Sequence, residues 1–129
     1  MLDVSKYLAE RLKAAGIPYP ACEEPMLEEQ AGPYVTWAVG ACKERWASGR
    51  AYERVYPVSV TLWFPLEFSD WRQALWAIAD ALDGGVDAGR AAEKGVRCYS
   101  YGITGAEDAP TIGRRCARVS ARVHESAWE

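Results

Sequence analysis

The stretch "VYPVSVTLWF", residues 55–64, alternates between two faces along its whole length. One face carries Tyr56, Val58, Val60, Leu62 and Phe64, and the other carries Val55, Pro57, Ser59, Thr61 and Trp63. This alternation predicts a β-strand with its first face in the core. Proline cannot donate to a sheet ladder, so we expect Pro57 at a sheet edge or at a strand start. No residue here suits metal or phosphate binding, so burial is the predicted role.

Three further segments also have the two-residue period of strands. They are "YVTWAV" at 34–39, "VRCYSYGI" at 96–103 and "RRCARVSARVH" at 114–124. In the last of them, one face carries Ala117, Val119, Ala121 and Val123, and the other carries Cys116, Arg118, Ser120, Arg122 and His124. One face of the sheet is therefore expected to pack against the core and the other to be exposed to solvent.

Two segments have the period of amphipathic helices. Val4, Leu8, Leu12 and Ala15 form the first apolar stripe, and Gly16 followed by Pro18 ends it. Trp71, Leu75, Ile78 and Leu82 form the second stripe. Ser69 or Asp70 is expected to cap this helix, with Gln73 in capping-box spacing, and "DGG" at 83–85 is expected to end it. The predicted fold class is therefore α+β, in the order α-β-β-α-β-β. An antiparallel four-stranded sheet would carry both helices on one face.

The segments between these elements are interpreted as loops. Residues 17–33 contain four prolines, and we expect Ile17, Tyr19, Met26 and Leu27 to pin this loop to the body. Residues 41–54, "ACKERWASGRAYER", are too long and too charged for a tight turn, which favours a partly mobile excursion at the tip of a hairpin. Residues 104–113 are expected to be a loop before the last strand.

Length and charge restrict the class of protein. A chain of 129 residues with 50% hydrophobic residues suits a single domain, 1–129, with its own core. The net charge of −3 argues against a nucleic-acid partner read by sequence. The apolar runs are too short to span a membrane, and the charged N-terminus is unlike a signal peptide, so we expect a cytoplasmic protein with no membrane partner.

The sequence contains few residues for catalysis. The cysteines, Cys22, Cys42, Cys98 and Cys116, are scattered, which favours four reduced thiols, although secretion would allow Cys22 to pair with Cys42 or Cys98 with Cys116. The one histidine, His124, can be drawn beside Cys98 or Cys116, but a polar residue on a wet strand face is the simpler interpretation. We therefore predict no catalytic, cofactor-binding or metal-binding residues and no cofactor.

Six tryptophans exceed what a small core readily hides, and tryptophan with arginine is typical of protein contact surfaces. A second buried face, supplied by another subunit, is the resulting hypothesis. The residues expected at a subunit or partner interface are Arg45, Trp46, Arg50, Arg54, Trp63, Trp76, Arg114, Arg118 and Arg122. Alternatively, the arginines of 114–122 and two nearby tyrosines, Tyr99 and Tyr101, could stack single-stranded bases, which we consider less favoured.

Five short motifs follow one another along the chain. They are the "LxxxLKxxG" pattern at 8–16, "PYV" at 33–35, "YPVSVTLWF" at 56–64, "ALDGG" at 81–85 and a closing hairpin. This layout resembles the small tail-terminator, or tail-completion, proteins of long-tailed phages and prophages. Head-closure and neck proteins of similar size are the nearest alternatives. The resemblance provides no functional residue that can be placed on this sequence.

The resemblance implies a structural protein of the virion, not an enzyme, which is in the host cytoplasm during assembly. It implies a self-assembled ring, commonly a hexamer, that caps the head-proximal end of the tail tube. Its partners would be the tail tube protein and the head-tail connector protein. Two alternatives from other classes stay open, a small cytosolic ligand- or partner-binding α+β module and an unrecognised enzyme.

Overall fold

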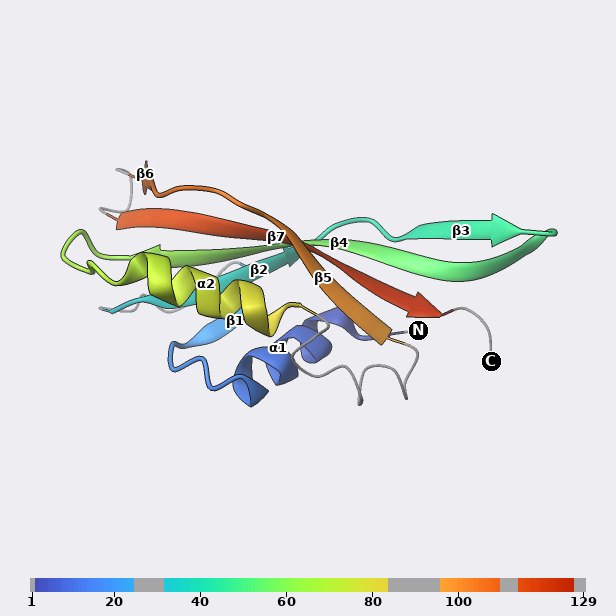
Figure 1. The fold of residues 1–129 in the computed structure, drawn as a ribbon, viewed down its shortest axis with the longest axis horizontal. Coiled ribbons are helices and arrows are strands. Elements are labelled where there is room, and N and C mark those ends of the chain that lie inside the picture. Colours follow the sequence, from blue (N-terminus) through green and yellow to red (C-terminus); the bar gives the residue numbers. More distant parts are fainter. Residues whose placement is uncertain (1, 25–31, 84–95, 110–113, 127–129) are drawn as a thin grey trace.

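The computed structural model describes residues 2–24, 32–83, 96–109 and 114–126 (Figure 1). Within these residues the protein is α+β, with two helices and a mixed sheet. In chain order the elements are α1 (Val4–Ala14), β1 (Ala21–Glu23), β2 (Tyr34–Val39), β3 (Lys43–Ala47), β4 (Arg50–Phe64), α2 (Trp71–Ala81), β5 (Val96–Ile103), β6 (Glu107–Ala109) and β7 (Arg114–Ser126).

The four predicted strands are adjacent in the sheet, in the order β2-β4-β7-β5, and all of their pairings are antiparallel. The predicted four-stranded sheet and the order α-β-β-α-β-β were wrong in detail, because three short strands are added. β1 pairs parallel to β2, β3 pairs with β4, and β6 pairs with β7. β1 and β6 have three residues each, too few to show a period, and both lie in segments interpreted as loops.

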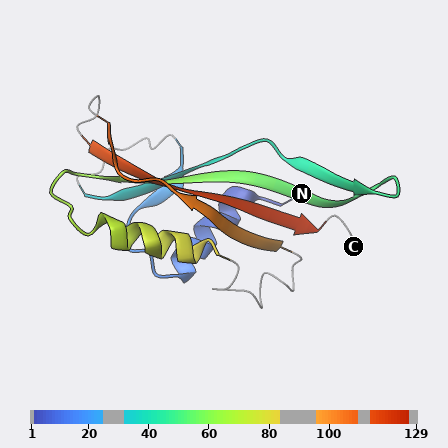
Figure 2. The ribbon, with the colours of Figure 1, turned by 45° about the horizontal axis from the view of Figure 1, so that its top comes forward.

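Both helices pack on the same face of the sheet, which we call the inner face (Figures 1 and 2). The predicted helix stripes and the predicted inner faces of β4 and β7 meet there in one buried cluster. Its members include Val4, Leu8, Leu12, Leu75, Ile78, Leu82, Tyr56, Val58, Val60, Leu62, Phe64, Ala117, Val119, Ala121 and Val123. Trp71 stacks on Phe64 at a centroid distance of 5.6 Å, which extends the cluster to the start of α2.

The ends of the helices were predicted in part. The carboxylate of Asp3 accepts a hydrogen bond from the Lys6 amide at 3.1 Å, and Gly16 ends α1 with a φ of 74°. Asp70 is the N-cap of α2, but its side chain makes no capping hydrogen bond, so the predicted capping box is not formed. The expected end of α2 at 83–85 lies partly outside the described residues, as do Met26 and Leu27. Burial of its apolar stripe is what holds α2 in place.

A buried arginine joins the two helices. The guanidinium of Arg11 donates to the carbonyl oxygens of Ala81 at 2.9 Å and Asp83 at 2.8 Å, and Arg11 is only 4% exposed. These carbonyls lie at the C-terminal end of α2, where backbone acceptors lack partners within the helix and where a cation is stabilised. The sequence analysis did not assign this role to Arg11, because arginine is usually an exposed residue.

Pro57 lies in the interior of β4, neither at a strand start nor at an outer edge, so its predicted position was wrong. It pairs with Arg122 of β7 on one side. On the other side, β2 ends opposite Val58 and β3 begins opposite Val55. The carbonyl of Pro57 faces this break and accepts the Gly40 amide at 2.7 Å. The N–H and C=O groups of one strand residue point to the same side of the strand. The position where Pro57 lacks an N–H therefore faces the same break, and the proline interrupts no ladder of hydrogen bonds.

Gly40 is required where the chain turns past Pro57. A Cβ at Gly40 would lie 2.7 Å from the Pro57 Cγ, which belongs to a rigid ring. We expect Gly40→Ala to destabilise the fold by about 1–3 kcal/mol, as overpacking does. Chemical denaturation followed by circular dichroism measures this loss. Gly105→Ala is the matched control, because nothing lies within 4 Å of the added Cβ, and an equal loss there would contradict the argument.

Residues 43–54, which we call the arm, form a β-hairpin from β3 and the start of β4. Its turn is tight, with φ values of 53° at Ser48 and 75° at Gly49, as in the two-residue turns that suit twisted hairpins. The segment expected as an excursion at the tip of a hairpin is therefore an extension of the hairpin that ends in a two-residue turn. The charged residues stand on an exposed ribbon, and its mobility stays a prediction. The arm projects past the helices at one end of the molecule (Figure 1, right).

Candidate interaction surface

The face of the sheet opposite the helices, which we call the outer face, is rich in cations and aromatic rings. β5 presents Arg97, Tyr99 and Tyr101 on it, and β7 presents Arg118 and Arg122. Tyr99 is 42% exposed and Tyr101 is 59% exposed. Tyr99 pairs directly with Arg122, so the expected neighbourhood of tyrosines and arginines is confirmed. Large exposed apolar groups mixed with arginine are typical of contact surfaces.

A β-bulge in β5 sets the position of Tyr101. The register with β7 shifts between Ser100 and Gly102, so Tyr101 is the extra residue of this strand. Bulges re-aim side chains and are frequent beside functional sites. The Cζ of Arg122 lies 4.7 Å from the centre of the Tyr101 ring, in cation–π geometry. The bulge therefore places one aromatic ring and one cation together on the outer face.

Two hollows meet at Tyr101 and Pro57, which line both. The larger hollow, about 380 Å³, lies where the base of the arm meets β5 and β7, and its lining residues are Lys43, Glu44, Arg45, Val55, Pro57, Tyr101, Arg122 and His124. The smaller hollow, about 300 Å³, extends from it toward β2. Three of the residues that line the larger hollow, Lys43, Arg45 and Arg122, are basic and one, Glu44, is acidic, which favours an anionic or acidic occupant.

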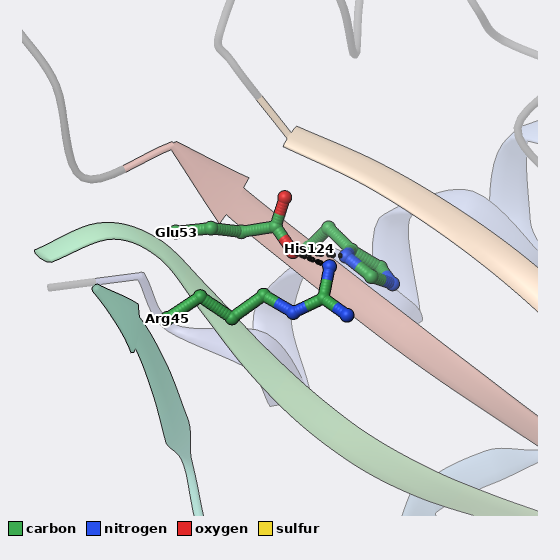
Figure 3. Close-up of polar contacts among 3 residues, drawn as sticks. All are labelled: Arg45, Glu53 and His124. Carbon is green, nitrogen blue, oxygen red and sulfur yellow. Dashed lines mark hydrogen bonds and ion pairs between the residues drawn. The ribbon is translucent and has the colours of Figure 1, made fainter. Parts of the chain in front are cut away.

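Glu53 ties the arm to the body at the edge of this hollow (Figure 3). Its Oε1 accepts a hydrogen bond from the Nδ1 of His124 at 2.8 Å and lies 3.6 Å from the Arg45 guanidinium. His124 also meets Tyr99 edge-to-face, with 5.5 Å between the ring centres. These contacts join β3, β4, β5 and β7, so the base of the arm has a fixed orientation on the outer face.

The cysteines and His124 do not form a nucleophile and base pair. Cys98 is buried on the inner face opposite Val123, whereas His124 lies on the outer face. Cys116 is on the outer face of β7, but it pairs with Trp63 and Glu107, eight residues along the strand from His124. All four cysteines are free, so neither disulfide that secretion would allow is formed. The hypothesis of a Cys–His pair was wrong.

Burial raises the pKa of the Cys98 thiol to about 12 and also raises the pKa of Cys116. We expect iodoacetamide to label exposed Cys42 at pH 8 within minutes and Cys98 at least about 100-fold more slowly, since the thiolate is the reactive form. Labelling of Cys98 as fast as Cys42, measured by mass spectrometry, would contradict this. The unfolded chain loses the Cys98 proton near its ordinary pKa of 9.0, whereas the folded chain keeps it up to about 12. The free energy of unfolding should therefore fall as the pH rises from 9.0 toward about 12.

The structure distributes the expected interface residues over four places. Arg45, Trp46, Arg50 and Arg54 belong to the arm, Arg118 and Arg122 to the outer face, Trp63 and Arg114 to the far end of that face, and Trp76 to the helix side. Trp46 and Trp76 are each 62% exposed. They are the two tryptophans of the expected set with most surface available for a partner.

Trp63 and Arg114 are already used within the subunit. The Trp63 Nε1 donates to the Thr36 Oγ1 at 2.9 Å, and its ring stacks on Tyr34. Arg114 donates to the Gly32 carbonyl at 3.0 Å and lies 5.1 Å from the centre of the Tyr34 ring. Both residues therefore support the end of the sheet, while Trp63 keeps the predicted outer-face position. Arg54 is likewise paired, with Glu125 at 3.4 Å.

Two exposed groups were missed by the sequence analysis. Leu66, which precedes α2, is 69% exposed, and the acidic residues around α2 were not considered as a surface. No cluster of three metal-ligating residues occurs among the residues that the structure describes. No helix in the described part of the chain has the length and apolar character needed to cross a membrane. Trp128, the last of the six tryptophans, lies outside the described residues.

Comparison with known proteins identifies the fold alone. No family model matches this chain, and no curated protein matches it. Among solved structures, 19 chains match. One of them aligns with a TM-score of 0.61 over 98% of this chain and 92% of its own, at 13% sequence identity. The chain is therefore an α+β protein with a fold also found among solved structures, and its exposed surfaces carry the argument about function.

Proposed function

We propose that this chain is a structural assembly protein that acts as a tail terminator. Copies form a closed ring, commonly of six, that caps the head-proximal end of the phage tail tube and joins it to the head-tail connector protein. The protein belongs to the virion and is in the host cytoplasm during assembly. In this role it needs no cofactor, and its surfaces bind proteins rather than convert substrates.

The observation that carries the proposal is the placement of exposed apolar residues on three separate surfaces. Trp46 lies on the arm, Trp76 on the exposed side of α2 with Leu66 in the turn before that helix, and Tyr99 and Tyr101 on the outer face. A subunit of a closed ring contacts two neighbours through two different surfaces. A terminator also contacts a tube on one side and a connector on the other. A protein with several contact surfaces and a rigid sheet between them fits this task.

The arm is the surface we assign to the axial partner, the tail tube protein. It projects past the helices at one end of the molecule and carries Trp46 among cationic residues, Lys43, Arg45 and Arg50. The contacts of Glu53 with Arg45 and His124 join the base of the arm to the body. Tryptophan and arginine dominate the binding energy of many interfaces.

A tube-capping experiment tests the proposal. A tail tube protein of a long-tailed phage is polymerised with and without this chain, and tube length and end occupancy are measured by electron microscopy. We expect the wild type to occupy one tube end and to stop growth, and Trp46→Ser to bind at least about 10-fold more weakly, as for a buried anchor. Lys13→Ser, an exposed residue of α1 outside the arm, the α2 side and the outer face, is the control.

Other outcomes identify the alternatives. Failure of the wild type to bind tube ends would overturn the terminator role. Binding to the connector protein alone would indicate a head-closure or neck protein. A monomer that retains a small molecule would indicate a ligand-binding module, with the larger hollow on the outer face as its site. Cys98 and Cys116, the two cysteines considered for the enzyme alternative, lie apart from His124.

A further inference from the structure

The exposed side of α2 is acidic and apolar. Gln73, Trp76, Ala77 and Asp80 are exposed at helical spacing and define a surface that we call the α2 stripe, together with Leu66 and Glu67 just before the helix. Trp76 and Asp80 are one turn apart, so their side chains are neighbours. Arg72 is also exposed, one turn before Trp76, and its guanidinium lies over the Trp71 ring at 4.9 Å, so this side of α2 carries one cation as well as carboxylates. The α2 stripe therefore presents aromatic surface beside carboxylates.

The outer face has the opposite charge and a similar apolar content. Arg97, Arg118 and Arg122 are exposed around Tyr99 and Tyr101. Because α2 buries Leu75 and Ile78 against the inner face, the α2 stripe points away from the sheet on the helix side. The two surfaces thus lie on opposite sides of one subunit and cannot meet within it. Each is complementary in charge to the other.

We propose that the α2 stripe of one copy packs on the outer face of the next copy, with Trp76 against the tyrosines and Glu67 and Asp80 against Arg118 and Arg122. The inference rests on the proposed function, because it names the two surfaces that would close the ring. Contact between different surfaces of identical subunits is heterologous, and it forms a ring when the rotation closes. Burying both apolar surfaces in this way leaves the arm available for the axial partner.

Charge argues for a second copy as the occupant of the outer face. The arm of a neighbour is a poor occupant, because Lys43, Arg45 and Arg50 would meet Arg118 and Arg122, and like charges across an interface are unfavourable. Single-stranded nucleic acid would suit the arginines and tyrosines of the outer face, but it would leave Leu66 and Trp76 uncovered. A second copy covers both surfaces with one contact.

Two charge-reversed variants test the pairing. Glu67→Arg with Asp80→Arg reverses the α2 stripe, and Arg118→Asp with Arg122→Asp reverses the outer face. All four residues are exposed, so both variants should fold, which circular dichroism checks. In each variant alone, like charges would oppose across every contact, and we expect the dissociation constant measured by sedimentation to rise at least about 100-fold.

The equimolar mixture of the two variants should assemble again. The basic α2 stripe of the Glu67→Arg, Asp80→Arg variant then meets the acidic outer face of the Arg118→Asp, Arg122→Asp variant. At the next contact, the native α2 stripe of the outer-face variant meets the native outer face of the stripe variant. Subunits would alternate around an even-numbered ring. The matched controls are Glu10→Arg and Lys13→Asp, which make the same kinds of charge change on the exposed side of α1 and should leave assembly unchanged.

Three results would overturn the pairing. If the wild type and both variants assemble equally, the copies meet through other surfaces, while the terminator role stands. If each variant fails alone and the mixture also fails, the two surfaces are not partners of each other. If the wild type caps tubes but is monomeric in solution at every concentration and on the tube, the outer face has another occupant. Binding of a fluorescent oligothymidylate to the wild type, lost in the outer-face variant, would identify that occupant as nucleic acid.

Discussion

Val60→Asp is expected to abolish folding. Val60 is fully buried in the central strand β4, between Trp37 of β2 and Val119 of β7, under both helices. A carboxyl group there must either remain charged without a partner or take up a proton without a hydrogen-bond acceptor. The cost exceeds about 4 kcal/mol, a large part of the 5–15 kcal/mol that typically stabilises a domain. Circular dichroism and the yield of soluble protein measure the loss.

The neighbouring residue provides a matched control. Ser59 is half-buried on the outer face, where it pairs with Ser120 of β7 and Ala38 of β2. A carboxylate at Ser59 reaches solvent and lies on the face that carries Arg118 and Arg122. Ser59→Asp is therefore expected to change the free energy of unfolding by less than about 1 kcal/mol. A folded Val60→Asp variant, or an unfolded Ser59→Asp variant, would contradict the assignment of the two faces.

Arg11→Ala is the second substitution with a large expected effect, about 3 kcal/mol of lost stability. It removes the donors that reach the Ala81 and Asp83 carbonyls and also the buried stem of the side chain. Hydrogen bonds to a charged group contribute about 1.5–3 kcal/mol, and carbonyls left buried without a donor add a penalty. Urea denaturation measures this change, and both helices should become less protected from hydrogen exchange.

Two variants show whether the geometry of Arg11 matters. Arg11→Lys keeps the charge but cannot hold both carbonyls in the same fork, so it should recover only part of the stability. Lys13→Ala, on the exposed side of the same helix, should be close to neutral. Equal stability of Arg11→Ala and Lys13→Ala would mean that the buried arginine does not join α1 to α2.

Long periodic segments made most of the fold predictable. The alternation in residues 55–64 identified the inner face of β4, and the stripes through Leu8 and Leu75 identified the helices, because burial selects for periodic apolar residues. The predicted bounds of β2 and β5 agree with the structure. These elements were predictable because each buries one complete face.

Elements without such a period were not predictable from the sequence. β1 and β6 are extended because β2 and β7 provide hydrogen-bond partners, which is a tertiary effect. Pro57 could not be placed because the break between β2 and β3 depends on where two other strands stop. The tight turn at Ser48 and Gly49 was missed because the charge of the surrounding residues indicated a loop.

The candidate surface was predictable in kind but not in arrangement. Excess tryptophan correctly indicated exposed rings, and Trp46 and Trp76 are among the most exposed apolar residues described. The tertiary fold alone shows that Trp63 is held by Tyr34 and Thr36. It also shows that a bulge turns Tyr101 toward Arg122. The α2 stripe could be identified only from the structure, because it depends on which side of α2 packs on the sheet.

Native mass spectrometry of the wild-type protein across a concentration series tests the central claim most directly. This claim is that copies of the chain cover the apolar surfaces which one subunit leaves exposed. We predict a closed assembly whose mass is a whole-number multiple of 14.3 kDa, commonly sixfold, either in solution or on tube ends. A strict 14.3 kDa monomer at every concentration and with tail tube protein present would contradict the claim.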